Sequence, residues 1–217
     1  MLVTQIREIS KAKIRITLDY EFAFVLYKGE LRSYPQLREG NEVDASVYES
    51  IKEEILYKRA KLYCMHLLEK RDYTEHQLKC KLNDAGYPKD VQEVAISYVK
   101  SFHYIDDVRY ANSYVAYASG HKSRKQIQQE LARKGVSQEI ILQVLASEES
   151  QEDSELELIN RLIVKKHYND ETATYEERRK MIGFLYRKGF ALDKIYKVLR
   201  EEDNSFENLM DGLNHNT

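Results

Sequence analysis

Two adjacent acids lie in the stretch SFHYIDDVRYANSYV, residues 101–115. Asp106 and Asp107 have apolar neighbours and are followed by Arg109. Neighbouring carboxylates of this kind can hold a divalent metal ion or act as a general acid and base. The stretch therefore raises the hypothesis of a hydrolase, whose divalent-metal binding would be lost when Asp107 is replaced by alanine.

Helix geometry favours a structural role for the same two acids. Consecutive residues on a helix point about 100° apart, so Asp106 and Asp107 would not converge on one ion. As a helix N-cap, Asp106 would contribute on the order of 1 kcal/mol. Asp107 would then lie in the first turn, where a negative charge suits the helix dipole. Arg109 is exposed one turn into this helix, and we expect it to brace the acid pair.

A second set of possible ligands comprises Cys64, His66, His76 and Cys80. His76 and Cys80 could share a helix face, whereas Cys64 and His66 are two residues apart and diverge. This spacing matches no common zinc pattern, so we predict no metal site. Both thiols are expected to be buried or half-buried. Gly-rich phosphate loops, HExxH and GxSxG are also missing from the sequence, and we predict a protein without cofactor or catalytic residues.

Basic side chains are the remaining source of chemistry. Lys125, Gln129 and Arg133 form a stripe with helical spacing, away from Ile127 and Leu131. Such a stripe could follow a phosphate backbone without reading base sequence, although a solubilising surface explains any single residue equally well. The candidate contacts with a partner or with DNA are Lys79, Lys81, Arg109, Lys122, Arg124, Lys125, Arg133, Lys134, Lys165, Lys166, Arg187 and Lys188.

The elements that carry these residues change in character near residue 45. KIRITLD (13–19) alternates apolar and polar residues, and EFAFVLYKG (21–29) is also rich in strand formers. The first 35 residues therefore predict a small antiparallel sheet of two or three strands. LREGNEVD (37–44) is rich in turn formers, and beyond it helical spacing continues almost to the C-terminus.

An internal repeat organises the helical part. Three segments, QLKCKLNDAGYPKDVQEVAISY, QIQQELARKGVSQEIILQVLAS and KMIGFLYRKGFALDKIYKVLRE, superimpose on Gly86, Gly135 and Gly189. Apolar residues recur at fixed distances on either side of each glycine, which places them on one face of two short helices. Each glycine is expected to take the left-handed C-cap conformation between those helices.

The starts of these helices agree with the repeat. Capping boxes lie at TEHQ (74–77), SRKQ (123–126) and TYEE (174–177). A leading helix is predicted before each box, at about residues 55–70, 107–119 and 154–168, which gives three helices per repeat. In the second of these, Tyr110, Tyr114 and Tyr117 would share one face as core or interface residues rather than platforms for bases.

We therefore predict a mainly α fold in which tandem three-helix repeats stack into an elongated, curved array, with a small N-terminal antiparallel β element. EESQEDSELE (148–157), which holds acids and no base, is expected to connect the second and third repeats. The predicted regions are a β-rich N-terminal region at 1–44, repeat one at 45–105 and repeat two at 106–147. Repeat three, with the acidic connector at its start, is predicted at 148–203, and a flexible tail at 204–217.

Bulk composition limits the possible partners. Lys and Arg total 34 against 36 Asp and Glu, giving a net charge of −2. Basic residues nevertheless exceed acidic ones in 58–147 and in 158–203, which indicates a partner with phosphates or an acidic surface. Two cysteines are too few for a disulfide framework and favour a reducing compartment. With no signal peptide, and FAFVLY (22–27) as the longest apolar run, we expect a cytosolic monomer that does not enter membranes.

The phrase FHYIDDVRYANSYV, followed by SRKQIQQELARKGV, resembles the central signature of the bacterial RecX regulatory proteins. That family's pattern is roughly G-Y-L-D-D-x-R-F/Y-A and then E-L-x-x-K-G-I. The resemblance covers about residues 55–200, and the β-containing extension is similar to that of longer Gram-positive members. The departures are His103, where the family often has glycine, and RDYTEHQL (71–78), where it usually has an R-x-R-S-x-x-E-L form.

The resemblance implies a partner and a function. Family members bind the RecA recombinase, lie in the groove of the RecA–DNA filament, and restrain its ATPase, strand exchange and co-protease activities in recombination, DNA repair and the SOS response. For this chain the resemblance implies a regulator that is not an enzyme and binds single- or double-stranded DNA weakly. The alternative is a stand-alone helical protein that binds DNA regardless of sequence, with a steep salt dependence.

Overall fold

The computed structural model describes residues 1–147 and 152–199. The chain forms two compact units, Met1–Tyr110 and Ala111–Thr217. The tail expected at 204–217 lies outside the described residues, as do the first residues of the predicted acidic connector. From Glu152 onward that connector is helical and forms the start of α9 (Glu152–Lys165).

The N-terminal unit begins with the predicted antiparallel sheet. Its strands are β1 (Val3–Glu8), β2 (Lys13–Leu18) and β3 (Glu21–Tyr27), in the order β1-β2-β3. Ile16 pairs with Phe24 and Ile14 with Leu26, so the apolar alternation faces one side and is buried there. This buried side packs on the helices, as a sheet of only three strands requires for stability.

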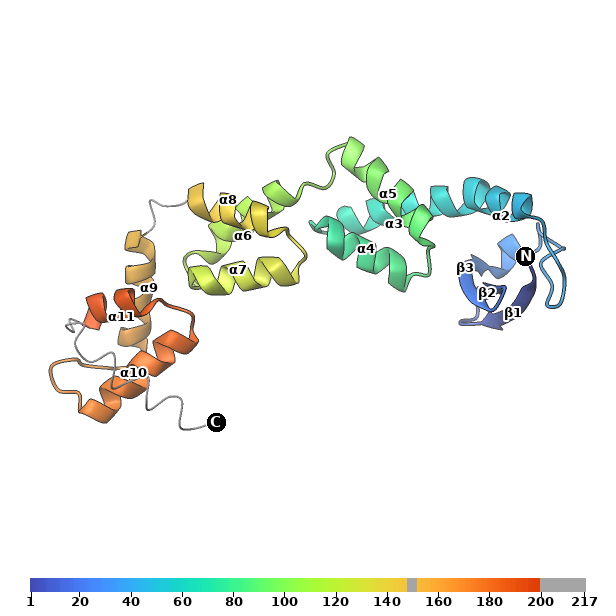
Figure 1. Ribbon diagram of the computed structural model, residues 1–217. Coiled ribbons are helices and arrows are strands. Elements are labelled where there is room, and N and C mark those ends of the chain that lie inside the picture. Colours follow the sequence, from blue (N-terminus) through green and yellow to red (C-terminus); the bar gives the residue numbers. More distant parts are fainter. Residues whose placement is uncertain (148–151, 200–217) are drawn as a thin grey trace. The chain divides into compact units, whose positions relative to one another are not determined.

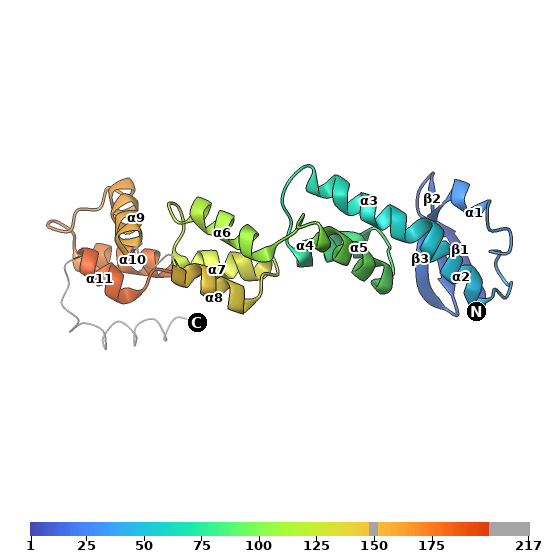
Figure 2. The ribbon, with the colours of Figure 1, turned by 90° about the horizontal axis from the view of Figure 1, so that it is seen from above.

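One long helical segment covers the sheet (Figures 1 and 2). After the short α1 (Lys28–Leu31), it runs without a break through α2 (Ala45–Ile51), the π-helical turn η1 (Lys52–Leu56) and α3 (Tyr57–Leu68). The rings of Phe24 and Tyr48 stack at 5.3 Å, joining sheet to helix. Burial of Lys52 in η1 disfavours its charged form and acts to lower its pKa. Hydrogen bonds to Asp90 and Glu49 outweigh this effect, and the pKa of Lys52 is raised.

Arg59 of α3 ties the sheet to the helices. Its guanidinium donates to the Val25 carbonyl at 2.5 Å, to Glu30 Oε2 at 2.6 Å and to the Tyr87 hydroxyl at 3.3 Å. The same guanidinium lies 5.0 Å from the Tyr27 ring centroid. One side chain thus contacts the last strand, the helix after it and the turn between two later helices.

The three predicted repeats are present, each with three helices. The first has α3, α4 (Glu75–Asp84) and α5 (Lys89–Ser101). The second has α6 (Asp107–Ala118), α7 (Arg124–Arg133) and α8 (Gln138–Ser147). The third has α9 (Glu152–Lys165), α10 (Tyr175–Arg187) and α11 (Leu192–Leu199). All three predicted capping boxes form, at Thr74, Ser123 and Thr174.

The repeat glycines take the predicted left-handed conformation. Gly86, Gly135 and Gly189 have φ of 81°, 82° and 87°. Gly86 also lies against the sheet, because a Cβ there would be 2.5 Å from Val25 Cγ2. The leucines four residues before the glycines, Leu82, Leu131 and Leu185, are all fully buried. The glycine is therefore required by backbone conformation and, at Gly86, by close packing as well.

Within the C-terminal unit, the second and third repeats are joined at Ser123. Its hydroxyl accepts the capping bond from Gln126 N and donates to the Lys188 carbonyl at 2.7 Å, at the end of α10. Glu155 of α9 accepts from Arg124 N at 3.0 Å and pairs with Lys194 at 2.7 Å. A Cβ at Gly189 would be 2.7 Å from the Ser123 hydroxyl, so the joint leaves no room for a side chain there.

Candidate functional site

The paired acids have separate structural roles. Asp106 Oδ1 accepts from Val108 N at 2.9 Å and Arg109 N at 3.0 Å, which is the predicted N-cap of α6. Asp107 instead accepts from Glu75 N at 2.9 Å, at the first turn of α4. The expectation that Asp107 mainly serves the dipole of its own helix was therefore incomplete. Burial raises the pKa of Asp107, and the backbone hydrogen bond from Glu75 opposes that rise.

Arg109 does not brace the acid pair. Its guanidinium donates to the carbonyls of His103 and Tyr104, at 3.2 and 3.3 Å. It thereby holds the loop before α6, in which His103 has a φ of 54°. Glycine adopts this left-handed conformation at less cost than histidine, so the bonds from Arg109 hold His103 in a conformation that its side chain disfavours. The prediction for Arg109 was wrong because backbone carbonyls in the loop compete for the guanidinium.

Replacing Asp107 by alanine should lower the free energy of unfolding by about 1 kcal/mol, because Glu75 N loses its acceptor. Asp107→Asn keeps an oxygen acceptor and should lose much less. The pKa of Asp107 in the folded protein lies above its ordinary value, so the folded protein becomes less stable as pH rises through that pKa and Asp107 ionises. The asparagine variant cannot ionise and should not show this loss of stability with pH. Urea unfolding at several pH values measures both effects. Divalent-metal binding that disappears in the alanine variant would instead support a hydrolase.

No three His, Cys, Asp or Glu residues gather to bind a metal within 1–147 and 152–199. Cys64 is buried, and burial raises its pKa to about 11. Cys80 is exposed, with its sulfur 3.6 Å from His76 Nε2. The expectation that both thiols would be at least half-buried was wrong for Cys80, because α4 turns that face to solvent.

Several of the candidate cations are already paired. Lys79 bonds Glu75 at 2.6 Å, and hydrogen bonds from Lys100 and then Lys79 hold the pKa of Glu75 below its usual range. Lys122 bonds Glu130 at 2.5 Å, beside the hydroxyl of Tyr114, and the hydrogen bond from Lys122 lowers the pKa of Glu130. Lys134 lies 5.3 Å from the centroid of the Tyr114 ring. These contacts give Lys79, Lys122 and Lys134 structural roles within their own repeats.

The predicted stripe on α7 is exposed as expected. Lys125, Gln129 and Arg133 face solvent, whereas Ile127 and Leu131 on the other side are buried. Lys125 also lies against the α10–α11 turn, where a Cβ at Gly189 would meet its Cβ at 3.2 Å. The exposed candidates without a carboxylate partner in the described part of the chain are Lys81, Arg109, Arg124, Lys125, Arg133, Lys165, Lys166, Arg187 and Lys188.

The tyrosines of α6 do not form one buried face. Ala111, Val115 and Ala118 are buried instead, and Tyr117 is 74% exposed. Tyr114 is half-buried and donates to Glu130. Of the two predicted roles, core or interface, the core role was wrong for Tyr117, because small residues, which let the helices approach closely, occupy the inner positions of α6. The interface role stays a prediction.

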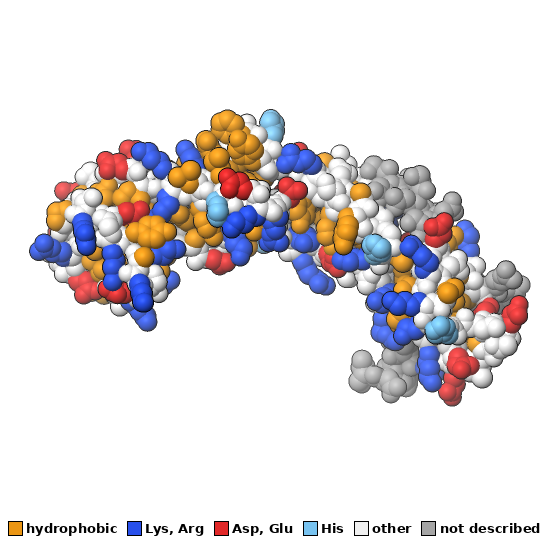
Figure 3. Space-filling model, turned by 180° about the vertical axis from the view of Figure 1, so that it is seen from behind, with side chains coloured by type: hydrophobic (Ala, Val, Ile, Leu, Met, Phe, Trp, Pro, Cys, Tyr) orange, Lys and Arg blue, Asp and Glu red, His pale blue; other side chains and the backbone are white. Residues whose placement is uncertain are grey.

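Sequence reasoning missed an exposed aromatic ladder where α5 ends, defined here as Tyr98, Phe102 and Tyr104. The first two rings lie 5.0 Å apart and the last two stack at 5.6 Å. Phe102 is 53% exposed and Tyr104 44%. Figure 3 shows hydrophobic side chains gathered over this part of the N-terminal unit. Exposed aromatic clusters of this kind mark interaction sites, and the short loop between α5 and α6 gives no periodic signal that would predict one.

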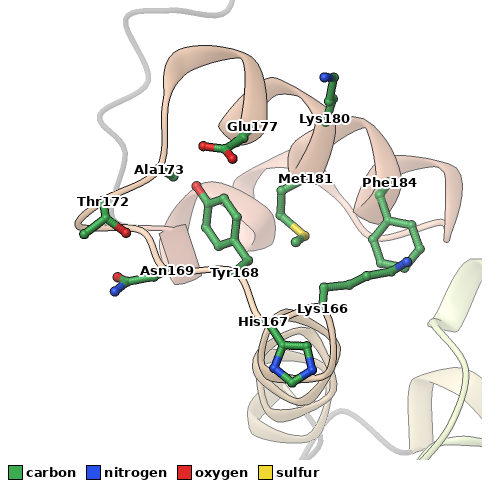
Figure 4. Close-up of a pocket in the computed structure, with 10 residues that line it drawn as sticks. All are labelled: Lys166, His167, Tyr168, Asn169, Thr172, Ala173, Glu177, Lys180, Met181 and Phe184. Atoms are coloured by element: carbon green, nitrogen blue, oxygen red, sulfur yellow. The ribbon is translucent and has the colours of Figure 1, made fainter.

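A cavity of about 460 Å³ opens in the third repeat, between the α9–α10 loop and α10 (Figure 4). Tyr168 and Met181 point into it, and Lys166 lies over the Phe184 ring at 5.0 Å. Its acid, Glu177, already accepts from Thr174 N and from the Thr174 hydroxyl as part of the capping box. Glu177, the one acid among the lining residues, thus serves the α10 N-terminus.

Comparisons with known proteins agree with this repeat architecture. Models of the first, second and third three-helix domains of RecX match residues 60–98, 106–145 and 152–199. A regulatory protein RecX from Caldanaerobacter subterraneus subsp. tengcongensis is 32% identical, over 92% of this chain and 98% of that protein. One from Clostridium acetobutylicum is 27% identical, over 88% of this chain and 90% of that protein.

Solved structures show the same fold. A crystal structure of a regulatory protein RecX matches with a TM-score of 0.60 at 23% identity, covering 93% of this chain and 99% of that one. RecX from Lactobacillus salivarius matches with a TM-score of 0.57 at 21% identity, over 67% of this chain and 95% of that one. No helix within 1–147 and 152–199 is long and apolar enough to cross a membrane. The three matched domains cover more than half of the sequence, and the chain therefore belongs to the RecX family of regulatory proteins.

Proposed function

We propose that this protein binds the RecA–DNA filament and restrains RecA activity in recombination and DNA repair, without catalysing a reaction itself. Membership of a family of regulatory proteins is the observation that carries the proposal. The proposal places the protein in the cytoplasm, where a RecA filament forms on DNA.

Two kinds of surface support a partner that combines protein with DNA. The aromatic ladder offers exposed rings, which are common at the centres of protein–protein interfaces. Lys125 and Arg133 on α7 offer exposed cations with no carboxylate partner among the described residues. We assign the ladder to RecA and the α7 cations to DNA phosphates.

The direct test is RecA-catalysed ATP hydrolysis on single-stranded DNA. Adding the protein in stoichiometric amounts should lower the rate of hydrolysis. No change would contradict the proposal. If DNA affinity without RecA were strong and steeply salt-dependent while RecA was unaffected, the stand-alone DNA-binding alternative would replace it.

Replacing Phe102 by serine should weaken inhibition of RecA by roughly 30-fold, since aromatic anchors at interface centres contribute about 2 kcal/mol. The ring is half exposed, so the fold should tolerate the change. Tyr117→Ser is the matched control, because Tyr117 is an exposed aromatic on α6 outside the ladder. Inhibition titrations that show equal loss in both variants, or in neither, would remove the ladder from the interface.

A further inference from the structure

The cavity of the third repeat has an apolar floor, defined here as Tyr168, Met181 and Phe184. These three side chains line the cavity and also pack in the hydrophobic core of the repeat. Figure 4 shows Tyr168 and Met181 pointing into the same space. A volume of about 460 Å³ is typical of a pocket that holds a ligand, and it has room for several apolar side chains. The floor is therefore a place where an apolar face can be buried.

Positive charge surrounds this floor. The rim lysines are defined here as Lys166, Lys180 and Lys188. The amines of Lys166 and Lys188 lie 5.0 and 5.9 Å from the centroid of the Phe184 ring, and neither has a carboxylate partner within the described residues. Lys180 reaches Glu176 at 3.8 Å, in a pair that is largely exposed. An apolar floor with a basic rim fits a segment that is both apolar and acidic.

The sequence after α11 has this character. Residues 200–217, outside the described part of the chain, hold five acids and one arginine. Their large apolar residues are Phe206, Leu209, Met210 and Leu213. The spacing i, i+3, i+4 and i+7 predicts that these four share one face of a helix, with Glu207 and Asp211 outside that face. The segment 206–213 is thus apolar on one side and acidic on the other.

An isolated helix of this length is unstable in water. The eight residues 206–213 are too few for a helix to form without packing, and Gly212 within them weakens it further. Such a helix forms only when its apolar face covers another apolar surface, because the packing then supplies the stability that the segment lacks.

The cavity is within reach of this segment. Leu199, at the end of α11, packs in the same hydrophobic core as Met181 and Phe184. The six residues 200–205, when extended, span up to about 20 Å, which is about the length of α10 beside the cavity. Attachment to the same chain gives the segment an effective concentration on the order of millimolar, so even a weak contact is populated.

We propose that residues 206–213 dock as an amphipathic helix in the cavity of the third repeat. Their apolar face packs on the floor, and Glu207 and Asp211 lie among the rim lysines. The chain thus occupies its own cavity, with an internal cover that an anionic partner has to displace from Lys166 and Lys188. The inference concerns contacts within the chain and does not depend on RecA as the partner.

A single tryptophan can report this contact. The sequence contains no tryptophan, so Phe206→Trp gives the full-length protein one indole on the apolar face of the segment. Docking should shift its emission to shorter wavelength and protect it from acrylamide, a neutral quencher that the rim lysines do not attract. The quenching constant should therefore lie well below that of the same protein in urea.

A charge swap in the Phe206→Trp protein tests the rim. Lys166→Glu with Lys180→Glu should raise the quenching constant by about threefold, because each exposed ion pair contributes a factor of about two to five to docking. Adding Glu207→Lys and Asp211→Lys restores opposite charges across the contact and should return the constant to its starting value.

Two further variants separate charge from apolar contact. Lys58→Glu with Lys81→Glu makes the same charge change at exposed positions of the N-terminal unit and should leave quenching unchanged. Leu209→Ser with Leu213→Ser removes half of the apolar face without changing charge and should release the indole. In the chain without the tryptophan, the same serine changes should raise the salt concentration that elutes the protein from heparin, because the rim lysines become open to an anion.

Three results would contradict the proposal. Quenching of Phe206→Trp that equals its value in urea would overturn it, and the cavity would then be open to an acidic segment of another protein. Protection that is lost on dilution would also overturn it, because the segment would then lie in a second copy of the chain. Unchanged elution from heparin would contradict the covering of the rim lysines. None of these measurements involves RecA, so failure of the proposed function would leave them unaffected.

Discussion

Replacing Gly86 by alanine should lower the free energy of unfolding of the N-terminal unit by about 3 kcal/mol. A left-handed conformation costs a residue with a Cβ roughly 1–2 kcal/mol. The new methyl group would in addition lie 2.5 Å from Val25 Cγ2, in a packed contact between the α4–α5 turn and β3. Overpacking of this kind typically costs about 1–3 kcal/mol. Urea unfolding followed by circular dichroism gives the difference.

Gly40 provides the matched control for this prediction. Its φ is 85°, close to that of Gly86, but a Cβ there would meet nothing within 4 Å. Gly40→Ala should therefore show the backbone cost alone, about 1–2 kcal/mol. Equal losses in the two variants would mean that the Val25 contact relaxes freely and that Gly86 is needed only for its conformation.

Replacing Arg59 by methionine should lower the free energy of unfolding by a similar amount, about 3 kcal/mol. Methionine retains most of the apolar stem but removes the guanidinium that donates to the Val25 carbonyl and neutralises Glu30, which keeps the bond from Tyr27 N. Both charged side chains are mostly buried, at 20% and 24% exposure, so water compensates only in part. Thermal and urea unfolding of the full chain measure the loss.

A double-mutant cycle separates the ion pair from the rest of the Arg59 contacts. Glu30→Gln alone removes the charge that Arg59 neutralises, and the pair of changes together removes the interaction. If Arg59→Met costs the same in wild type and in Glu30→Gln, the contacts with the Val25 carbonyl, Tyr87 and Tyr27 carry the stabilisation. Arg59→Lys should remain well below wild-type stability, because an ammonium cannot reach three acceptors in a planar fork.

The helical repeats could be predicted from the sequence because the features that define them each involve only a few neighbouring residues. A glycine that alone tolerates positive φ, a hydroxyl at the N-cap and apolar side chains at fixed spacing act over one or two turns. Gly135 and its cap at Ser123 behave as that local chemistry requires. The alternating apolar residues of β2 likewise predicted a sheet that is buried on one side.

Contacts between elements distant in sequence could not be predicted in this way. Asp107 accepts from Glu75, 32 residues earlier, and no local pattern identifies that partner. Cys80 was expected to be at least half-buried, and Tyr117 to lie in the core or at an interface. Both are exposed, because which residues face inward depends on how closely neighbouring helices approach. The aromatic ladder depends on a loop conformation fixed by Arg109 and a left-handed His103. Of the candidate site, the exposure of the α7 stripe was predicted, whereas the pairing of Lys79 and Lys122 was not.

The hydroxyl of Ser123 has a consequence for how the C-terminal unit unfolds. One side chain caps the start of α7 and also holds the last carbonyl of α10, so loss of either helix end removes a bond from the other. The stability of a linear repeat array is the sum of the stability of each repeat and the stability of each interface between neighbouring repeats. The bond from Ser123 to Lys188 contributes to such an interface. The second and third repeats should therefore melt in a single transition, and Ser123→Ala should broaden that transition or split it in two.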